Sequence, residues 1–73
     1  MTRLPVMSGQ EILKLLSKHG FQIAGRKGSH IRLKKKEKNK TFIVIVPDHK
    51  EIPPETLKSI LRQAGISEDI IRK

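Results

Sequence analysis

The sequence predicts one small α+β domain, in which a three-stranded antiparallel sheet packs against two helices on one face. Apolar residues recur with the helical period of 3.6 near both ends of the chain and with the strand period of 2 in the middle, which gives the order α-β-β-β-α. Short turns separate the strands, so neighbouring strands must be antiparallel. A length of 73 residues leaves room for a single domain, residues 1–73.

Residues 9–19 are predicted to form the first helix. Ser8-Gly9-Gln10-Glu11 is a capping box, and Met7 can staple against the first helical turn. The apolar stripe consists of Ile12, Leu13, Leu15 and Leu16. Gly20 is expected to end the helix in the left-handed conformation.

Residues 21–25 are predicted to form a short first strand that ends at Gly25, followed by a turn over residues 25–28. The second strand, residues 30–34, alternates strictly. Ile31 and Leu33 share one face, and the other face carries His30, Arg32 and Lys34. If the apolar pair faces the core, the histidine and the two cations line up on the outward face.

A Lys-rich turn leads to the third strand, residues 41–46, which is apolar almost throughout. This run predicts a strand that is buried on both sides or central in the sheet, ended by Pro47. Pro53-Pro54 begins the second helix, and Gly65 ends it. The helix has the stripe Leu57, Ile60, Leu61 and Ala64. Double-stranded-RNA-binding domains share this element order, an analogy of fold that assigns no function by itself.

Positive charge is concentrated in one segment. The chain has 16 Lys+Arg against 7 Asp+Glu, a formal charge of +9, and half of these cations lie between Arg26 and Lys40 with Glu37 as the only acid. Such a one-sided field favours nucleic acid as partner, ahead of an acidic protein or an anionic membrane. The plainer alternative is a Lys-rich turn that keeps a hairpin soluble and its edges unpaired.

The composition also excludes several kinds of chemistry. Without cysteine there is no disulfide framework, thiolate nucleophile or Cys-based zinc site, which fits a reducing cytosol. The longest apolar run, residues 42–46, is too short for a membrane span, and the N-terminal residues lack a signal-peptide core. We therefore expect a cytoplasmic protein with no membrane partner. The acids are scattered, so no metal site and no small-molecule cofactor are expected.

Three histidines are candidates for acid–base work. His19, in the last turn of the first helix, is expected to be structural. His30 follows Gly-Ser and opens the second strand inside the cationic segment, where nearby charges favour the neutral imidazole that a general base needs. An exposed lone histidine is equally often mere surface. His49, beside Asp48, could assist at a phosphate, although a local cap is the commoner role.

RNA is a substrate that brings its own nucleophile, because its 2′-hydroxyl lies beside the phosphodiester. One base and a few cations then suffice for slow, metal-independent cleavage. The candidates are His30 as catalytic base, Arg26, Lys27, Gly28, Ser29, Arg32 and Lys34 as RNA-binding residues, and His49 as a possible auxiliary group. With no Trp or Tyr, binding should depend on phosphates and helix shape. The alternative is a non-catalytic module that binds double-stranded or structured RNA.

Several motifs together resemble one family. They are Leu4-Pro5-Val6-x-Ser8-Gly9, Gly20-Phe21, Lys27-Gly28-Ser29-His30, Val46-Pro47-x-His49, and the second-helix run from Thr56-Leu57 to Gly65-Ile66-Ser67. The chain thereby resembles the HicA-type (YcfA-like) toxins of prokaryotic toxin–antitoxin pairs. The resemblance implies a double-stranded-RNA-binding-like fold, ribosome-independent cleavage of mRNA that arrests growth, an essential histidine at His30, and a HicB-type antitoxin that covers the active surface. Glu55 stands where many relatives have glycine.

Overall fold

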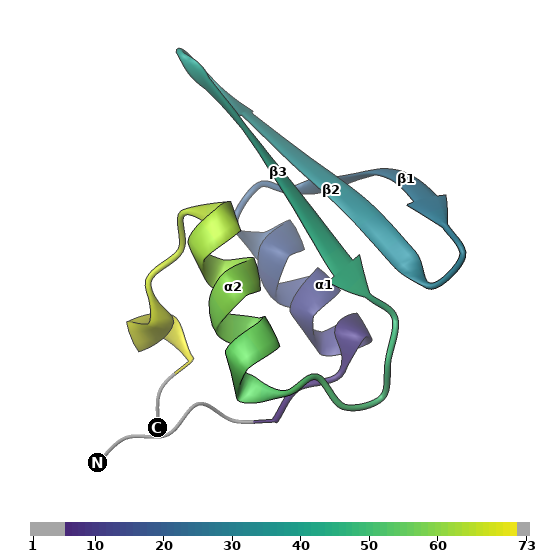
Figure 1. The fold of residues 1–73 in the computed structure, drawn as a ribbon. Coiled ribbons are helices and arrows are strands. Elements are labelled where there is room, and N and C mark those ends of the chain that lie inside the picture. Colours follow the sequence, from purple (N-terminus) through teal and green to yellow (C-terminus); the bar gives the residue numbers. More distant parts are fainter. Residues whose placement is uncertain (1–5, 72–73) are drawn as a thin grey trace.

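The computed structural model describes residues 6–71 and confirms the α+β class. The elements are α1 (Gly9–Lys18), β1 (Gln22–Lys27), β2 (His30–Glu37), β3 (Lys40–Pro47), α2 (Pro54–Ala64) and a short 3-10 turn, η1 (Glu68–Ile70). The sheet has the order β1-β2-β3 with both pairings antiparallel. Figure 1 shows the two helices side by side on one face of the sheet. Leu4 and Pro5 of the resemblance motif lie outside the described residues.

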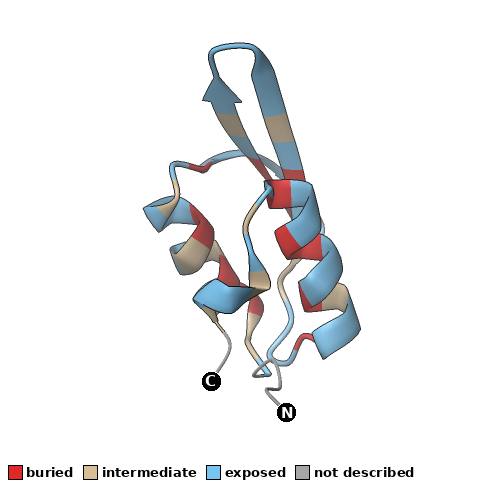
Figure 2. Ribbon diagram, turned by 90° about the vertical axis from the view of Figure 1, so that its left-hand side faces the viewer, coloured by how far each residue is buried: buried red, intermediate tan, exposed pale blue. Residues whose placement is uncertain are grey.

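The core lies between the two helices and the inner face of the sheet. Its buried side chains are Ile12, Leu16, Phe21, Ile31, Leu33, Val44, Val46, Ile52, Leu57, Ile60, Leu61 and Ala64. In β2 burial alternates as predicted, with Ile31 and Leu33 inside and His30, Arg32 and Lys34 exposed. In Figure 2 the buried segments gather where helices and sheet meet, whereas the far end of the β2–β3 hairpin is mostly exposed. The outer face of the sheet is therefore open.

The predicted capping box and the glycines after the helices are confirmed, whereas α1 ends at Lys18 and His19, predicted as its last residue, is the C-cap. The Ser8 amide donates to Glu11 Oε1 at 2.9 Å, and the Glu11 amide donates to Ser8 Oγ at 3.1 Å, so the capping box closes. Gly20 and Gly65 follow α1 and α2 with φ of +93° and +71°, a conformation that costs glycine little. The segments that precede the two helices are also joined to each other, because the Ile52 amide donates to the Met7 carbonyl at 2.8 Å.

The first hairpin differs from its prediction. β1 does not end at Gly25 but continues to Lys27, and the turn consists of Gly28 and Ser29 alone. The physical reason is an irregularity in the pairing with β2, whose register shifts between Ile23 and Gly25. Gly25 thus marks a bulge inside the strand, a second common use of a strand glycine.

The third strand was predicted to be buried on both sides or central, and this is wrong. β2 is central and β3 is an edge strand, with Val44 and Val46 buried but Ile43 and Ile45 50% and 49% exposed on the open face. The Lys-rich segment is not a turn either, because β2 runs on to Glu37, β3 starts at Lys40, and only residues 38–39 turn. Figure 1 shows this long hairpin projecting past the helices.

A test of the packing concerns Gly9, the first residue of α1. It is buried, and its amide donates to the His49 carbonyl at 2.8 Å. A Cβ here would press on the Pro47 carbonyl oxygen and lie 3.1 Å from Asp48 Cα, both of them backbone atoms that cannot rotate away. We expect Gly9→Ala to lower the free energy of unfolding by about 1–3 kcal/mol in urea denaturation.

The matched control is Gly25→Ala, because a Cβ at Gly25 meets no atom within 4 Å. This variant should change the free energy of unfolding by less than about 0.5 kcal/mol. Equal midpoints for the two variants would contradict the close approach of α1 to the loop after β3.

Candidate nucleic-acid interface

The open face of the sheet carries a row of basic side chains along β2. His30, Arg32 and Lys34 alternate with the buried Ile31 and Leu33, so all three project outward. Directly paired residues of an antiparallel ladder share a face. Lys27 of β1 pairs with His30, and Ile45 of β3 pairs with Arg32, so these two side chains join the same face.

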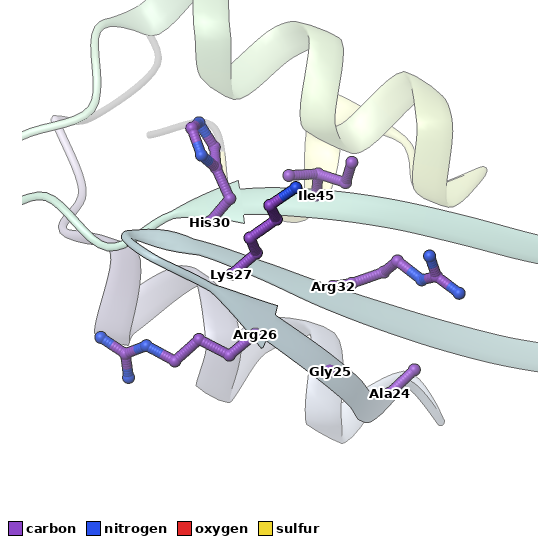
Figure 3. Close-up of a pocket in the computed structure, with 7 residues that line it drawn as sticks. All are labelled: Ala24, Gly25, Arg26, Lys27, His30, Arg32 and Ile45. Atoms are coloured by element: carbon purple, nitrogen blue, oxygen red, sulfur yellow. The ribbon is translucent and has the colours of Figure 1, made fainter.

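An open hollow of about 750 Å³ lies on this face. Its lining residues are Ala24, Gly25, Arg26, Lys27, His30, Arg32 and Ile45. Figure 3 shows the side chains of Lys27 and His30 on one side of the strands, near Ile45. Gly25 pairs with Arg32 and leaves the floor free, because a Cβ there would meet no other atom within 4 Å. Lys27 and Arg32 border this hollow and Ile45 forms part of its wall, which suits a phosphate joined to a sugar or base.

Arg26 differs from the other cations. It pairs with the buried Ile31, and its guanidinium points away from His30 in Figure 3. Its Nη2 lies 2.9 Å from Asp48 Oδ2, and its Nε donates to the Gly28 carbonyl at 3.1 Å. The structure therefore gives Arg26 partners within the protein, separate from Lys27, Arg32 and Lys34.

Asp48 connects the β1–β2 turn to two other segments. Besides Arg26, its carboxylate accepts from Gln10 Nε2 of α1 at 3.1 Å. Its amide donates to the Ser29 carbonyl at 2.6 Å. Gly28, with φ of +60°, provides the left-handed residue of this turn. These contacts hold the turn that leads directly into His30.

The remaining histidines occupy different places. His19 is the C-cap residue of α1, where its backbone amide donates to the Leu16 carbonyl at 3.0 Å. His49 is exposed and follows Pro47, the residue that pairs with His30. Its carbonyl accepts from the Gly9 amide, while the neighbouring Asp48 carboxylate is bound to Arg26 and Gln10. His49 is thus on the same end of the sheet as His30.

Sequence reasoning missed three kinds of residue in this region. Ile45 has the opposite strand parity to Val44 and Val46, so alternation could have placed it beside the cations. Gly25 was interpreted as a strand end. Asp48 was considered only as a partner of His49, and no local pattern links it to Arg26, which lies 22 positions away.

Two kinds of feature are absent from residues 6–71. No three His, Asp or Glu side chains in this part of the chain gather into a group that could hold a metal ion. Within the same residues no helix has the length and apolar character needed to cross a membrane.

The comparison with protein families gives one match. A family model described as the HicA toxin of bacterial toxin–antitoxin systems matches residues 9–66, from the start of α1 to just beyond α2. The chain belongs to the HicA toxin family. As a HicA toxin it has an antitoxin as its implied partner. The comparison with curated proteins finds no match, and neither does the comparison with solved structures.

Filling the hollow tests its role in this HicA toxin. A Cβ at Gly25 meets no atom within 4 Å, so we expect Gly25→Leu to fold with a nearly unchanged melting temperature. Its side chain would occupy the hollow and weaken RNA binding at least about tenfold, or 1.4 kcal/mol. The measurement is fluorescence anisotropy with 2′-O-methyl RNA, which cannot be cleaved through its 2′-oxygen. Gly25→Ala is the control, and wild-type affinity in Gly25→Leu would contradict binding in the hollow.

Proposed function

We propose that this toxin is an endoribonuclease that cleaves mRNA without metal or ribosome and is neutralised by a HicB-type antitoxin. The observation that carries the proposal is the position of His30, exposed on the open face and lining one hollow with Lys27 and Arg32. Family membership supports the toxin role. Arg32, Lys27 and Lys34 are the proposed phosphate contacts, with Gly28 and Ser29 shaping the turn, whereas Arg26 holds that turn through Asp48.

In the proposed reaction the neutral imidazole of His30 accepts the proton of a ribose 2′-hydroxyl. The 2′-oxygen then forms a bond to the adjacent phosphorus, and the bond from phosphorus to the 5′-oxygen breaks. The leaving 5′-oxygen takes a proton from water, and the products end in a 2′,3′-cyclic phosphate and a 5′-hydroxyl. Lys27 and Arg32 stabilise the negative charge that builds up on the phosphoryl oxygens.

The hollow supports this assignment because it gives the substrate access from solvent. His30 is exposed and lines the hollow, and glycine at position 25 leaves room beside Arg32. A general base contributes on the order of 10²–10⁴-fold, and preorganised cations add charge stabilisation. We therefore expect a slow enzyme, whose rate is limited by a single base and a shallow site.

The first test replaces the proposed base. Purified His30→Ala should remain folded and bind 2′-O-methyl RNA, because the side chain is exposed. In EDTA it should lose at least about 10²-fold in cleavage rate. The wild type should yield 2′,3′-cyclic phosphate ends in EDTA and leave DNA of the same sequence intact.

The control is His19→Asn, which removes an imidazole from the C-cap of α1 and leaves the open face unchanged. Undiminished cleavage by a clean His30→Ala preparation would refute the role of His30. An intact strand with only a salt-sensitive shift for the wild type would instead support a non-catalytic RNA-binding module.

The antitoxin is proposed to cover the same open face. Ile43 and Ile45 are half-exposed there and pair with Lys34 and Arg32, so apolar and cationic groups alternate across two strands. Such a surface fits a protein partner that offers carboxylates and aliphatic side chains together. Phosphates alone leave the isoleucines without a partner.

The second test concerns Ile43, which lies outside the hollow around His30. Ile43 is half exposed, and a partner on this face would bury the exposed part. Ile43→Ser should therefore weaken antitoxin binding by about 1 kcal/mol, or roughly fivefold in Kd. Calorimetric titration of the purified pair measures the change. Ile70→Ser is the matched control, because Ile70 is 48% exposed in η1, on the helical side of the molecule. Equal losses in the two variants would contradict docking on the open face.

A further inference from the structure

The lysines of the projecting β2–β3 hairpin divide into two sets according to the face they occupy. Lys35 Nζ lies 5.8 Å from the centroid of the Phe21 ring, and Lys40 Nζ lies 5.0 Å from that of Phe42. Both ammonium groups are thus attracted to aromatic faces of the protein itself. Lys34 and Lys36 alternate with Lys35 and project from the open face, exposed and without an ion pair to any residue between 6 and 71.

A second hollow, of about 410 Å³, adjoins these two lysines. It is lined by Gly20, Gln22, Ile23, Ala24, Lys34 and Lys36. Ala24 lines both hollows, so the second lies next to the one at His30. β1 begins at Gln22, opposite Lys34, and Lys36 therefore lies beyond the end of β1, where β2 has only β3 beside it.

The outward row on β2 is long enough for several nucleotides. From His30 through Arg32 and Lys34 to Lys36 it extends about 20 Å, at about 3.3 Å per residue. From Arg32 to Lys36 a cationic side chain recurs about every 7 Å, and no acid is interposed on this face of the strand. Repulsion among these cations raises the free energy of the isolated protein. A polyanion that lies along the row reduces this repulsion.

We propose that Lys34 and Lys36, with the second hollow, form a distal phosphate-binding subsite for the RNA strand whose scissile bond lies at His30. The proposal rests on the proposed function, which places RNA at the first hollow. RNA is favoured over an acidic protein here because the second hollow shares Ala24 with the first and is lined by Lys34 and Lys36, whose ammonium groups have no ion pair among residues 6–71. The toxin then selects long RNA over a dinucleotide, which cannot reach Lys36 from His30.

The test uses Lys36→Gln, since Lys36 lies outside the first hollow. We expect its ratio of kcat/KM on a long structured RNA to kcat/KM on a dinucleotide to fall several-fold, with the loss in KM for the long RNA. With 2′-O-methyl RNA, the slope of log Kd against log salt concentration should decrease by about 1. Lys36→Arg keeps the charge and should restore both values.

The matched control is Lys58→Gln, which removes the same charge from an exposed position on α2. A Lys36→Gln protein indistinguishable from Lys58→Gln in both measurements would overturn the subsite. So would a loss confined to antitoxin affinity, which would make the hairpin a protein-docking surface. If the wild type cleaves neither substrate, the proposed nuclease function fails, while the salt slope on 2′-O-methyl RNA still decides the subsite separately.

Discussion

The structure depends on the alternation of apolar and polar side chains along β2. This strand is central in a sheet that the helices cover on one face only. Ile31 and Leu33 are almost fully buried against the helices, and each contributes about 1.5–3 kcal/mol by leaving water. A shift of one residue would expose both and bring Arg32 into the core without a partner, at a cost of several kcal/mol. The register that stabilises the core therefore also fixes His30, Arg32 and Lys34 on the open face. Core and candidate site cannot vary independently in this strand.

The sequence was sufficient wherever the signal is local. The capping box of Ser8 and Glu11, the left-handed Gly20, the helix end at Gly65 and the apolar stripe of α2 were all predicted, because each involves residues within one or two helical turns. The third strand was not, since Ile43 and Ile45 are as apolar as Val44 and Val46. A continuous apolar run indicates two covered faces. The apolar run does not show that one face is open. The position of both helices on the same face of the sheet shows it.

The site illustrates a second limit, which is the face of each cation. Arg26 and Lys27 are adjacent in the sequence, yet strand geometry sends them to opposite sides, where one meets Asp48 and the other lies beside His30. Lys34 and Lys35 also lie on opposite faces, and the ammonium group of Lys35 lies over the Phe21 ring. Charge density alone predicted a basic segment correctly. Charge density could not predict which cations bind partners within the protein, because those partners come from distant segments of the chain.

The mixture of isoleucines and cations on the open face gives the two proposed ligands different physical signatures. Binding of RNA through Lys27, Arg32 and Lys34 would release counterions and weaken steeply as salt rises. A protein partner that also covers Ile43 and Ile45 gains from burial of apolar surface, which salt does not screen. At physiological ionic strength this difference would favour the proposed antitoxin over RNA for one shared surface. The exposed isoleucines, which add little to phosphate binding, would then make the proposed inhibition at this face effective.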